Sequence, residues 1–143
     1  MIAQTQPTFV IVGAGGISRS YAQAFVQGLP YPIVGVADIR LESAQEVANM
    51  CQVPAFDDVD RMVDELRPAA AIVCTPPSTH PEICCRLMEQ GVHVLCEKPL
   101  AISTDEAIRM AETAQRSRVV FSMGSKFRFV ADVQKAREIL DSG

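Results

Sequence analysis

One segment near the N-terminus constrains the fold more than any other part of the sequence. The apolar run Phe9–Val12 leads directly into Gly13-Ala-Gly-Gly-Ile-Ser18, and a helical pattern follows at once. Gly13 permits a tight turn, Gly15 has no side chain to block a pyrophosphate, and Ser18 lets the helix pack closely on the strand. The start of a helix also favours an anion. The residues expected to hold the anion are Gly13, Ala14, Gly15, Gly16 and Ile17. The alternative is an ordinary strand-to-helix turn.

An acidic residue in the expected position supports dinucleotide binding. Asp38 lies 25 residues beyond Gly13, at the end of a second apolar run, where its carboxylate can accept hydrogen bonds from the adenosine ribose. The same carboxylate would repel a 2′-phosphate, so NAD is the expected cofactor. Arg40 leaves NADP open, because a nearby guanidinium can pair with that phosphate. The alternative role of Asp38 is to cap the helix predicted from Leu41.

Runs rich in β-branched residues alternate with amphipathic stretches, which is typical of βαβ units around a parallel sheet. Strands are expected at residues 9–12, 33–37, 70–74, 92–96 and 119–123. Helices are expected at residues 17–27, 41–50, 59–66, 79–91, 103–116 and 130–140, with capping boxes at Thr79–Glu82 and Ser103–Glu106. The sequence therefore predicts an α/β fold, a doubly wound parallel sheet of about six strands with helices on both faces. Residues 1–123 are expected to form a dinucleotide-binding domain, and residues 124–143 to cross towards a second domain.

The composition excludes several classes of function. Hydrophobic residues make up 48% of the chain and charged residues 21%, as in globular proteins. The net charge of −4 argues against a nucleic-acid or membrane-surface binder, and no apolar run is long enough to cross a bilayer. Met1 to Thr8 carries no basic residue of the kind that opens a secretion signal, so a cytoplasmic protein is expected. The five cysteines lack zinc-site or disulfide spacing, so we expect them reduced and without a metal.

Two further loops are expected at the carboxyl ends of neighbouring strands, the edge where open α/β sheets bind ligands. They belong to Ala71-Ile-Val-Cys-Thr-Pro-Pro-Ser-Thr-His80 and to Val92-His-Val-Leu-Cys-Glu-Lys-Pro-Leu100. A lysine at such an edge can contact a ligand oxygen or a phosphate. Together with the glycine loop, these segments resemble the N-terminal domain of the Gfo/Idh/MocA oxidoreductase family over essentially all 143 residues. The Glu-Lys-Pro triplet at residues 97–99 is the most specific part of the resemblance.

The resemblance implies roles for residues in these loops. Glu97 would hold the nicotinamide-side ribose, and Lys98 would lie beside the nicotinamide and the substrate as the catalytic residue. The Lys98–Pro99 peptide bond is expected to be cis. The loop residues that would line the nicotinamide region are Thr75, Pro76, Pro77 and His80, and the candidate substrate contacts are Lys126 and Arg128. Roles without ligand contact stay open: a solvated lysine at 98, an ordinary helix residue at 80, and surface or interdomain residues at 126 and 128.

The activity implied for the intact protein is reversible hydride transfer between NAD(P) and a secondary alcohol of a sugar, an inositol or a related polyol. Family members are more than twice as long, so we expect a C-terminal domain to carry the acid–base pair and a homo-oligomer interface. These 143 residues alone would then bind the cofactor without turnover. The alternatives are a non-catalytic dinucleotide-binding module and a different Rossmann reductase, similar to biliverdin or dihydrodipicolinate reductase.

Overall fold

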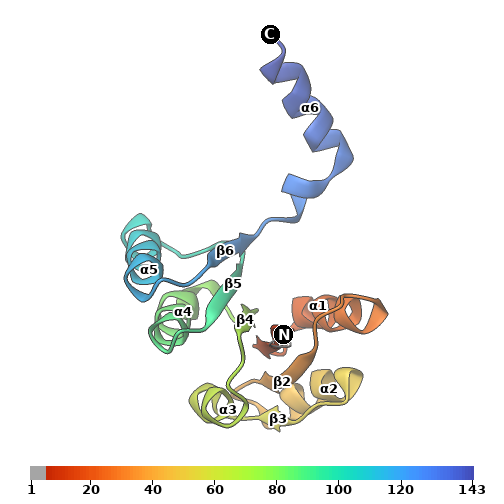
Figure 1. The fold of residues 1–143 in the computed structure, drawn as a ribbon, viewed down its shortest axis with the longest axis vertical. Coiled ribbons are helices and arrows are strands. Elements are labelled where there is room, and N and C mark those ends of the chain that lie inside the picture. The colour runs from red at the N-terminus through yellow and green to blue at the C-terminus, as the bar shows by residue number, and fades with distance from the viewer. Residues whose placement is uncertain (1–5) are drawn as a thin grey trace, which may run out of the picture.

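The computed structural model describes residues 6–143, and its centre is a single parallel sheet (Figure 1). The strands are β1 (Phe9–Val12), β2 (Ile33–Ala37), β3 (Ala55–Phe56), β4 (Ala70–Val73), β5 (His93–Glu97) and β6 (Phe121–Gly124). They lie in the order β3-β2-β1-β4-β5-β6, and every neighbouring pair is parallel. The predicted doubly wound α/β fold is confirmed. We expect no secretion signal in Met1 to Thr8, and residues 1–5 of that stretch lie outside the described residues.

Six α-helices accompany the strands among the described residues. They are α1 (Gly16–Gln27), α2 (Leu41–Cys51), α3 (Val59–Leu66), α4 (His80–Glu89), α5 (Thr104–Ser117) and α6 (Ala131–Asp141), with short 3-10 turns η1 (Pro77–Thr79) and η2 (Lys126–Phe129). Helices α1 and α2 cover one face of the sheet and α3, α4 and α5 the other, while α6 extends away from the rest (Figure 1). Within residues 6–143 no helix is both long enough and apolar enough to span a bilayer.

The core consists of two apolar clusters, one on each face of the sheet. Successive residues of β1 serve opposite clusters: Val10 and Val12 pack with Met62 of α3, and Ile11 packs with Val47 of α2. This alternation follows from the two-residue period of a strand. The four residues of β4 are all buried, as expected for a central strand with helices on both faces.

The strand order reverses between β1 and β4. β1 pairs with β2 on one side and with β4 on the other, so the chain winds outward in both directions from this point. In open α/β sheets, ligands bind beyond the carboxyl ends of the strands at such a switch point. The loops after β1, β2, β4, β5 and β6 all leave the sheet at this edge, so the fold brings the predicted site residues to one side of the molecule.

Local signals in the sequence have mixed outcomes. The serine half of the Ser103 capping box is confirmed, since Ser103 accepts a hydrogen bond from the Glu106 amide, whereas the Glu106 side chain accepts from the Ile102 amide. The Thr79 capping box is wrong. The Thr79 hydroxyl contacts the Thr75 hydroxyl at 2.9 Å and the Pro76 carbonyl at 2.8 Å, because the turn η1 folds the preceding loop back onto it. The short strand β3, which no predicted range covers, has only two residues and so carries no recognisable alternation.

Candidate functional site

The glycine loop between β1 and α1 contains two glycines that are required for different reasons. Gly13 has φ +91°, and a Cβ there would lie 2.7 Å from the Thr75 backbone nitrogen. The backbone of Cys74 and Thr75, directly after β4, therefore excludes any side chain at Gly13. A Cβ on Gly15 would meet nothing within 4 Å, and its backbone is ordinary extended chain. Nothing in the protein requires glycine at that position, so the open backbone fits the close approach of a ligand from outside.

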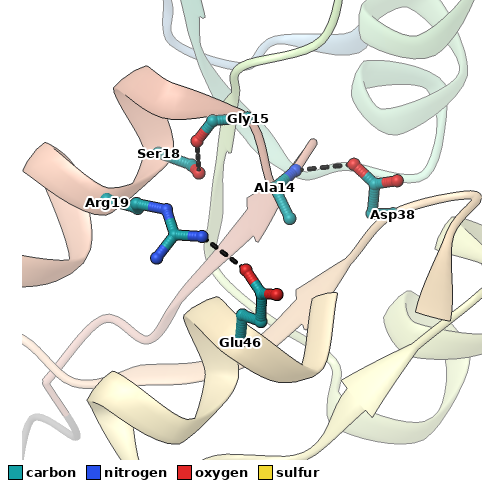
Figure 2. A network of polar contacts seen from close by, with 6 residues as sticks. All are labelled: Ala14, Gly15, Ser18, Arg19, Asp38 and Glu46. Atoms are coloured by element: carbon teal, nitrogen blue, oxygen red, sulfur yellow. Dashed lines mark hydrogen bonds and ion pairs between the residues drawn. The ribbon is translucent and has the colours of Figure 1, made fainter. Parts of the chain in front are cut away.

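The first turn of α1 presents uncapped amides. Gly15 is the N-cap residue and makes no side-chain capping bond. Ser18 is fully buried and donates a hydrogen bond to the Gly15 carbonyl, as close helix–strand packing predicts (Figure 2). Amides in a first helical turn have no partner inside the helix, so those of Gly15, Gly16 and Ile17 suit an anion. The sequence also predicts that the Ala14 amide faces the anion. In the structure this amide donates to the Asp38 carboxylate instead.

Asp38, at the end of β2, ties the loop to the neighbouring strand. One carboxylate oxygen accepts from the Ala14 amide at 2.7 Å (Figure 2), and the other accepts from the Arg40 amide at 2.9 Å. The alternative role as cap of α2 is excluded, because Arg40 is the N-cap residue and no side chain caps that helix. Each carboxylate oxygen has a second lone pair, so Asp38 can still accept from ribose hydroxyls. The protein thus holds this acid in place before any ligand binds.

A cavity of about 580 Å³, called here the Asp38 hollow, opens beside this loop. The predicted residues among its lining are Gly13, Gly15, Asp38, Arg40, Thr75 and Pro76. Apolar walls come from Ile39, Val59 and Ile83, which the sequence reasoning missed. Ile39 is 93% exposed, the highest fraction among the exposed large apolar side chains of the described residues. Its position directly after Asp38 is the signal that could have identified Ile39 as part of this apolar wall.

A second cavity of about 990 Å³, called here the Lys98 hollow, lies on the other side of α1, against β5, β6 and η2. It brings together Glu97 and Lys98 with Lys126 and Arg128, although the two pairs are far apart in sequence. Ile17 from the glycine loop also lines it. The two hollows therefore flank the start of α1, which matches a ligand with two halves joined by a pyrophosphate.

Two hydrogen bonds hold the Glu97 carboxylate at the C-terminal end of β5. The Tyr21 hydroxyl donates to one carboxylate oxygen at 2.7 Å, and the Lys98 amide donates to the other at 3.1 Å. Burial, followed by the hydrogen bond to Glu97, raises the pKa of Tyr21 above its ordinary value. The phenol therefore stays protonated and acts as a donor. Sequence reasoning missed Tyr21, whose one signal is its position one helical turn after Ile17.

His80 lies between two loops, with 1% of its surface exposed. Its Nε2 is 2.8 Å from the Thr75 carbonyl oxygen, and its Nδ1 is 3.1 Å from the Pro99 carbonyl oxygen. Neither His80 nor Pro77 lines the two hollows formed by the described residues. The Lys98–Pro99 peptide bond is cis, as predicted. The ring of His80 thus packs between the Thr-Pro-Pro loop and the Glu-Lys-Pro loop, and its one N–H in the neutral form can donate to one of the two carbonyl oxygens.

The cysteines belong to the core. All five are free, and Cys74, Cys84 and Cys96 are buried. Burial is the main cause that raises the pKa of the Cys74 thiol, to about 12. No group of three or more metal-ligating side chains occurs within residues 6–143. The chemistry available at this edge of the sheet is therefore that of the glycine loop, two carboxylates and four cations.

Comparisons with known proteins agree with this geometry. The model of the Gfo/Idh/MocA family, described as an oxidoreductase family with an NAD-binding Rossmann fold, matches residues 8–125. The chain is 35% identical to glucose-6-phosphate 3-dehydrogenase of Bacillus subtilis over 91% of its own length and 37% of that protein. It is 32% identical to D-glucoside 3-dehydrogenase of Escherichia coli over 93% of its own length and 38% of that protein. It spans well under half of either relative.

A solved structure shares the fold. The WlbA dehydrogenase from Bordetella pertussis, in complex with NADH and UDP-GlcNAcA, superposes with a TM-score of 0.92. The match covers 97% of this chain and 43% of that one, at 24% sequence identity. This similarity shows that the six-stranded arrangement is a Rossmann fold.

Proposed function

Because this chain belongs to the Gfo/Idh/MocA oxidoreductase family by its NAD-binding Rossmann fold, we propose that it binds NAD for hydride transfer to and from a secondary alcohol of a sugar, an inositol or a related polyol. The observation that carries the proposal is the pair of hollows on either side of an uncapped helix start. A dinucleotide has the same plan, with two nucleoside halves and a pyrophosphate between them. The alcohol is proposed because both curated relatives described above are named as sugar 3-dehydrogenases.

The adenosine half would lie in the Asp38 hollow. Asp38 would accept hydrogen bonds from the ribose hydroxyls, and Ile39 would cover one face of the adenine. The pyrophosphate would lie over Gly15, where the amides of Gly16 and Ile17 can donate to it. Thr75 and Pro76 would border the same half, in place of the nicotinamide region that the family resemblance implies, since they line the Asp38 hollow rather than the other one. Pro77 and His80 would support this loop from behind.

The nicotinamide half and the substrate would share the Lys98 hollow. Bound there, the nicotinamide supplies the hydride acceptor and donor at its C4 atom. Glu97 would accept hydrogen bonds from the nicotinamide-side ribose. Lys98, whose side chain is exposed at the hollow, would donate to the reacting oxygen of the alcohol and stabilise its developing negative charge, or pass its proton to an acid–base group. Lys126 and Arg128 would hold other oxygens of the substrate.

A further domain would complete the site in the intact protein. We propose that this domain covers the Lys98 hollow, supplies the acid–base pair and mediates homo-oligomer formation. Exclusion of water from the hollow would strengthen each electrostatic contact in it. Residues 124–143 would lead towards it, since α6 makes no buried contact with the Rossmann core among the described residues.

The test combines a binding and a turnover measurement. NAD and NADH are titrated into the purified chain by calorimetry, and NAD reduction is followed at 340 nm with inositols, common sugars and sugar phosphates as substrates. The same assays are run on the intact gene product. We expect both proteins to bind NADH and only the longer one to reduce NAD. Retained binding without turnover by the intact protein would instead support a non-catalytic dinucleotide-binding module, and absent NADH binding would refute the proposal.

A further inference from the structure

A tyrosine on the first helix reaches the carboxylate at the end of the fifth strand. Tyr21 follows Ile17 by four residues on α1, so the two side chains share one face of the helix and both line the Lys98 hollow. The Tyr21 hydroxyl donates to Glu97 Oε1 at 2.7 Å across a sequence separation of 76 residues. The contact joins the helix that begins at the glycine loop to the strand that ends at Lys98.

The neighbouring strand leaves space for this contact. Gly124, at the end of β6, pairs with Glu97 in the sheet register. A Cβ on Gly124 would lie 2.7 Å from the Tyr21 hydroxyl oxygen and 3.1 Å from Glu97 Oε1. Gly124 is absent from the glycines with positive φ, so its backbone conformation does not require glycine. A side chain at this position would instead displace the ends of the Tyr21 and Glu97 side chains.

Two donors then leave the carboxylate little freedom. Oε1 accepts from Tyr21, and Oε2 accepts from the Lys98 amide at 3.1 Å. Without the phenol, one oxygen of a long and half-exposed side chain would be released to rotate. A carboxylate oxygen can accept two hydrogen bonds, so each oxygen of Glu97 keeps one lone pair for a ligand. A carboxylate fixed in this way suits the two neighbouring hydroxyls of a ribose.

The chemistry of Tyr21 is that of a donor rather than an acid or base. Burial and the adjacent Glu97 raise its pKa above the ordinary value, so the phenol keeps its proton over the working range of a dehydrogenase. The hydroxyl can therefore hold Glu97 but takes no part in proton transfer.

We infer that Tyr21 is a positioning residue: its hydroxyl, in the space left by Gly124, orients Glu97 to receive the nicotinamide-side ribose. The inference rests on the proposed function, because it assumes that the nicotinamide half of NAD lies in the Lys98 hollow. It adds a residue of α1 to the recognition of the ribose and assigns Gly124 a reason to be glycine.

The test compares three ligands that contain different parts of the cofactor. NADH contains the second ribose and the nicotinamide, ADP-ribose contains the ribose alone, and ADP contains neither. In Tyr21→Phe we expect affinity for NADH and ADP-ribose to fall about 5- to 10-fold, the effect of a lost hydrogen bond that acts through a charged group, with ADP affinity unchanged. The matched control is Tyr31→Phe. Tyr31 is the other tyrosine of the chain, is 41% exposed and packs on Phe9, so all three affinities should stay at the wild-type values.

A second variant perturbs the same contact without removal of the hydroxyl. Gly124→Ala should displace the phenol and reproduce the ligand pattern of Tyr21→Phe, and the double variant should lose less affinity than the sum of the two. Unchanged NADH affinity in Tyr21→Phe, an equal loss for ADP, or a loss for NADH without one for ADP-ribose would each overturn the inference. A wild-type chain that binds ADP but not NADH would overturn the proposed function itself, which separates the two failures.

Discussion

Substitution of Gly15 by valine should abolish measurable NAD binding while the domain still folds. A Cβ at this position meets no protein atom within 4 Å, and φ −79° with ψ −170° is an allowed conformation for any residue. The loss of glycine at an N-cap costs the fold about 0.5–1 kcal/mol. That is small beside the 5–15 kcal/mol, roughly, by which domains are stable. The new side chain would instead stand where the pyrophosphate approaches the backbone.

The expected loss of affinity follows from the hydrogen bonds that the phosphate would lose. A hydrogen bond to a charged group contributes about 1.5–3 kcal/mol. If valine prevents two amides of the loop from reaching the phosphate, binding weakens by about 3–6 kcal/mol, which is roughly 10²- to 10⁴-fold in Kd. Calorimetric titration with NADH measures this loss, and thermal unfolding of the same sample shows whether the fold is retained.

Gly13→Ala provides the matched control in the same loop. Its φ of +91° is unfavourable for alanine by about 1–2 kcal/mol. The overlap with the Thr75 and Cys74 backbone adds about 1–3 kcal/mol of strain. Gly13→Ala should therefore lower the free energy of unfolding, which Gly15→Val should leave nearly unchanged. NADH affinity at the wild-type level in folded Gly15→Val would refute the reasoning, because the loop would then be an ordinary turn.

Three other outcomes are expected. Lys98→Ala in the intact enzyme should lower kcat about 10²-fold or more, as for a donor to a developing oxyanion, with NADH affinity nearly unchanged; equal losses in both would assign Lys98 to binding. NADH should bind at least about 100-fold more tightly than NADPH, because Asp38 opposes the 2′-phosphate, and tighter NADPH binding would give that role to Arg40. The pKa of the Cys74 thiol is about 12 in the folded protein against 9.0 in the unfolded chain. The contribution of the buried neutral thiol to the free energy of unfolding is therefore complete below about pH 9 and is lost as pH rises towards 12. Urea unfolding of Cys74→Ala should show a shallower decline over that range.

Most of the fold could be predicted because its signals are local. The β-branched runs, the glycine loop and the Ser103 cap each depend on residues within one turn or strand, and the structure confirms them. The sequence wrongly predicts that Thr79 caps α4, because the Thr79 hydroxyl instead contacts the Thr75 hydroxyl in the preceding loop. The choice between Asp38 as cap and as loop anchor also required coordinates. Arg40 lies only two residues after Asp38, and the sequence does not show that Arg40 is the N-cap residue of α2.

The parts of the site that were missed depend on long-range contacts. The Tyr21–Glu97 pair spans 76 residues, and the space over Gly124 exists only after β6 has paired with β5. Such a contact cannot be predicted from the periodicity or the residue spacing of a single sequence. The apolar wall that Ile39 contributes to the Asp38 hollow is an intermediate case. The residue follows Asp38 directly, but its 93% exposure shows that it does not belong to the core.

The position of His80 shows how the two hollows are kept in register. Thr75 lines the Asp38 hollow, and Pro99 follows the lysine that lines the Lys98 hollow. The ring of His80 lies between the carbonyl oxygens of these two residues, at 2.8 Å and 3.1 Å, with almost no exposed surface. Neither carbonyl lies within a regular strand, so a side chain has to supply the link between the loops. Both halves of a dinucleotide can bind at the same time only if the two loops keep a compatible separation. A neutral imidazole has one N–H, so it can donate a hydrogen bond to only one of these two carbonyl oxygens, while the buried ring packs between both loops.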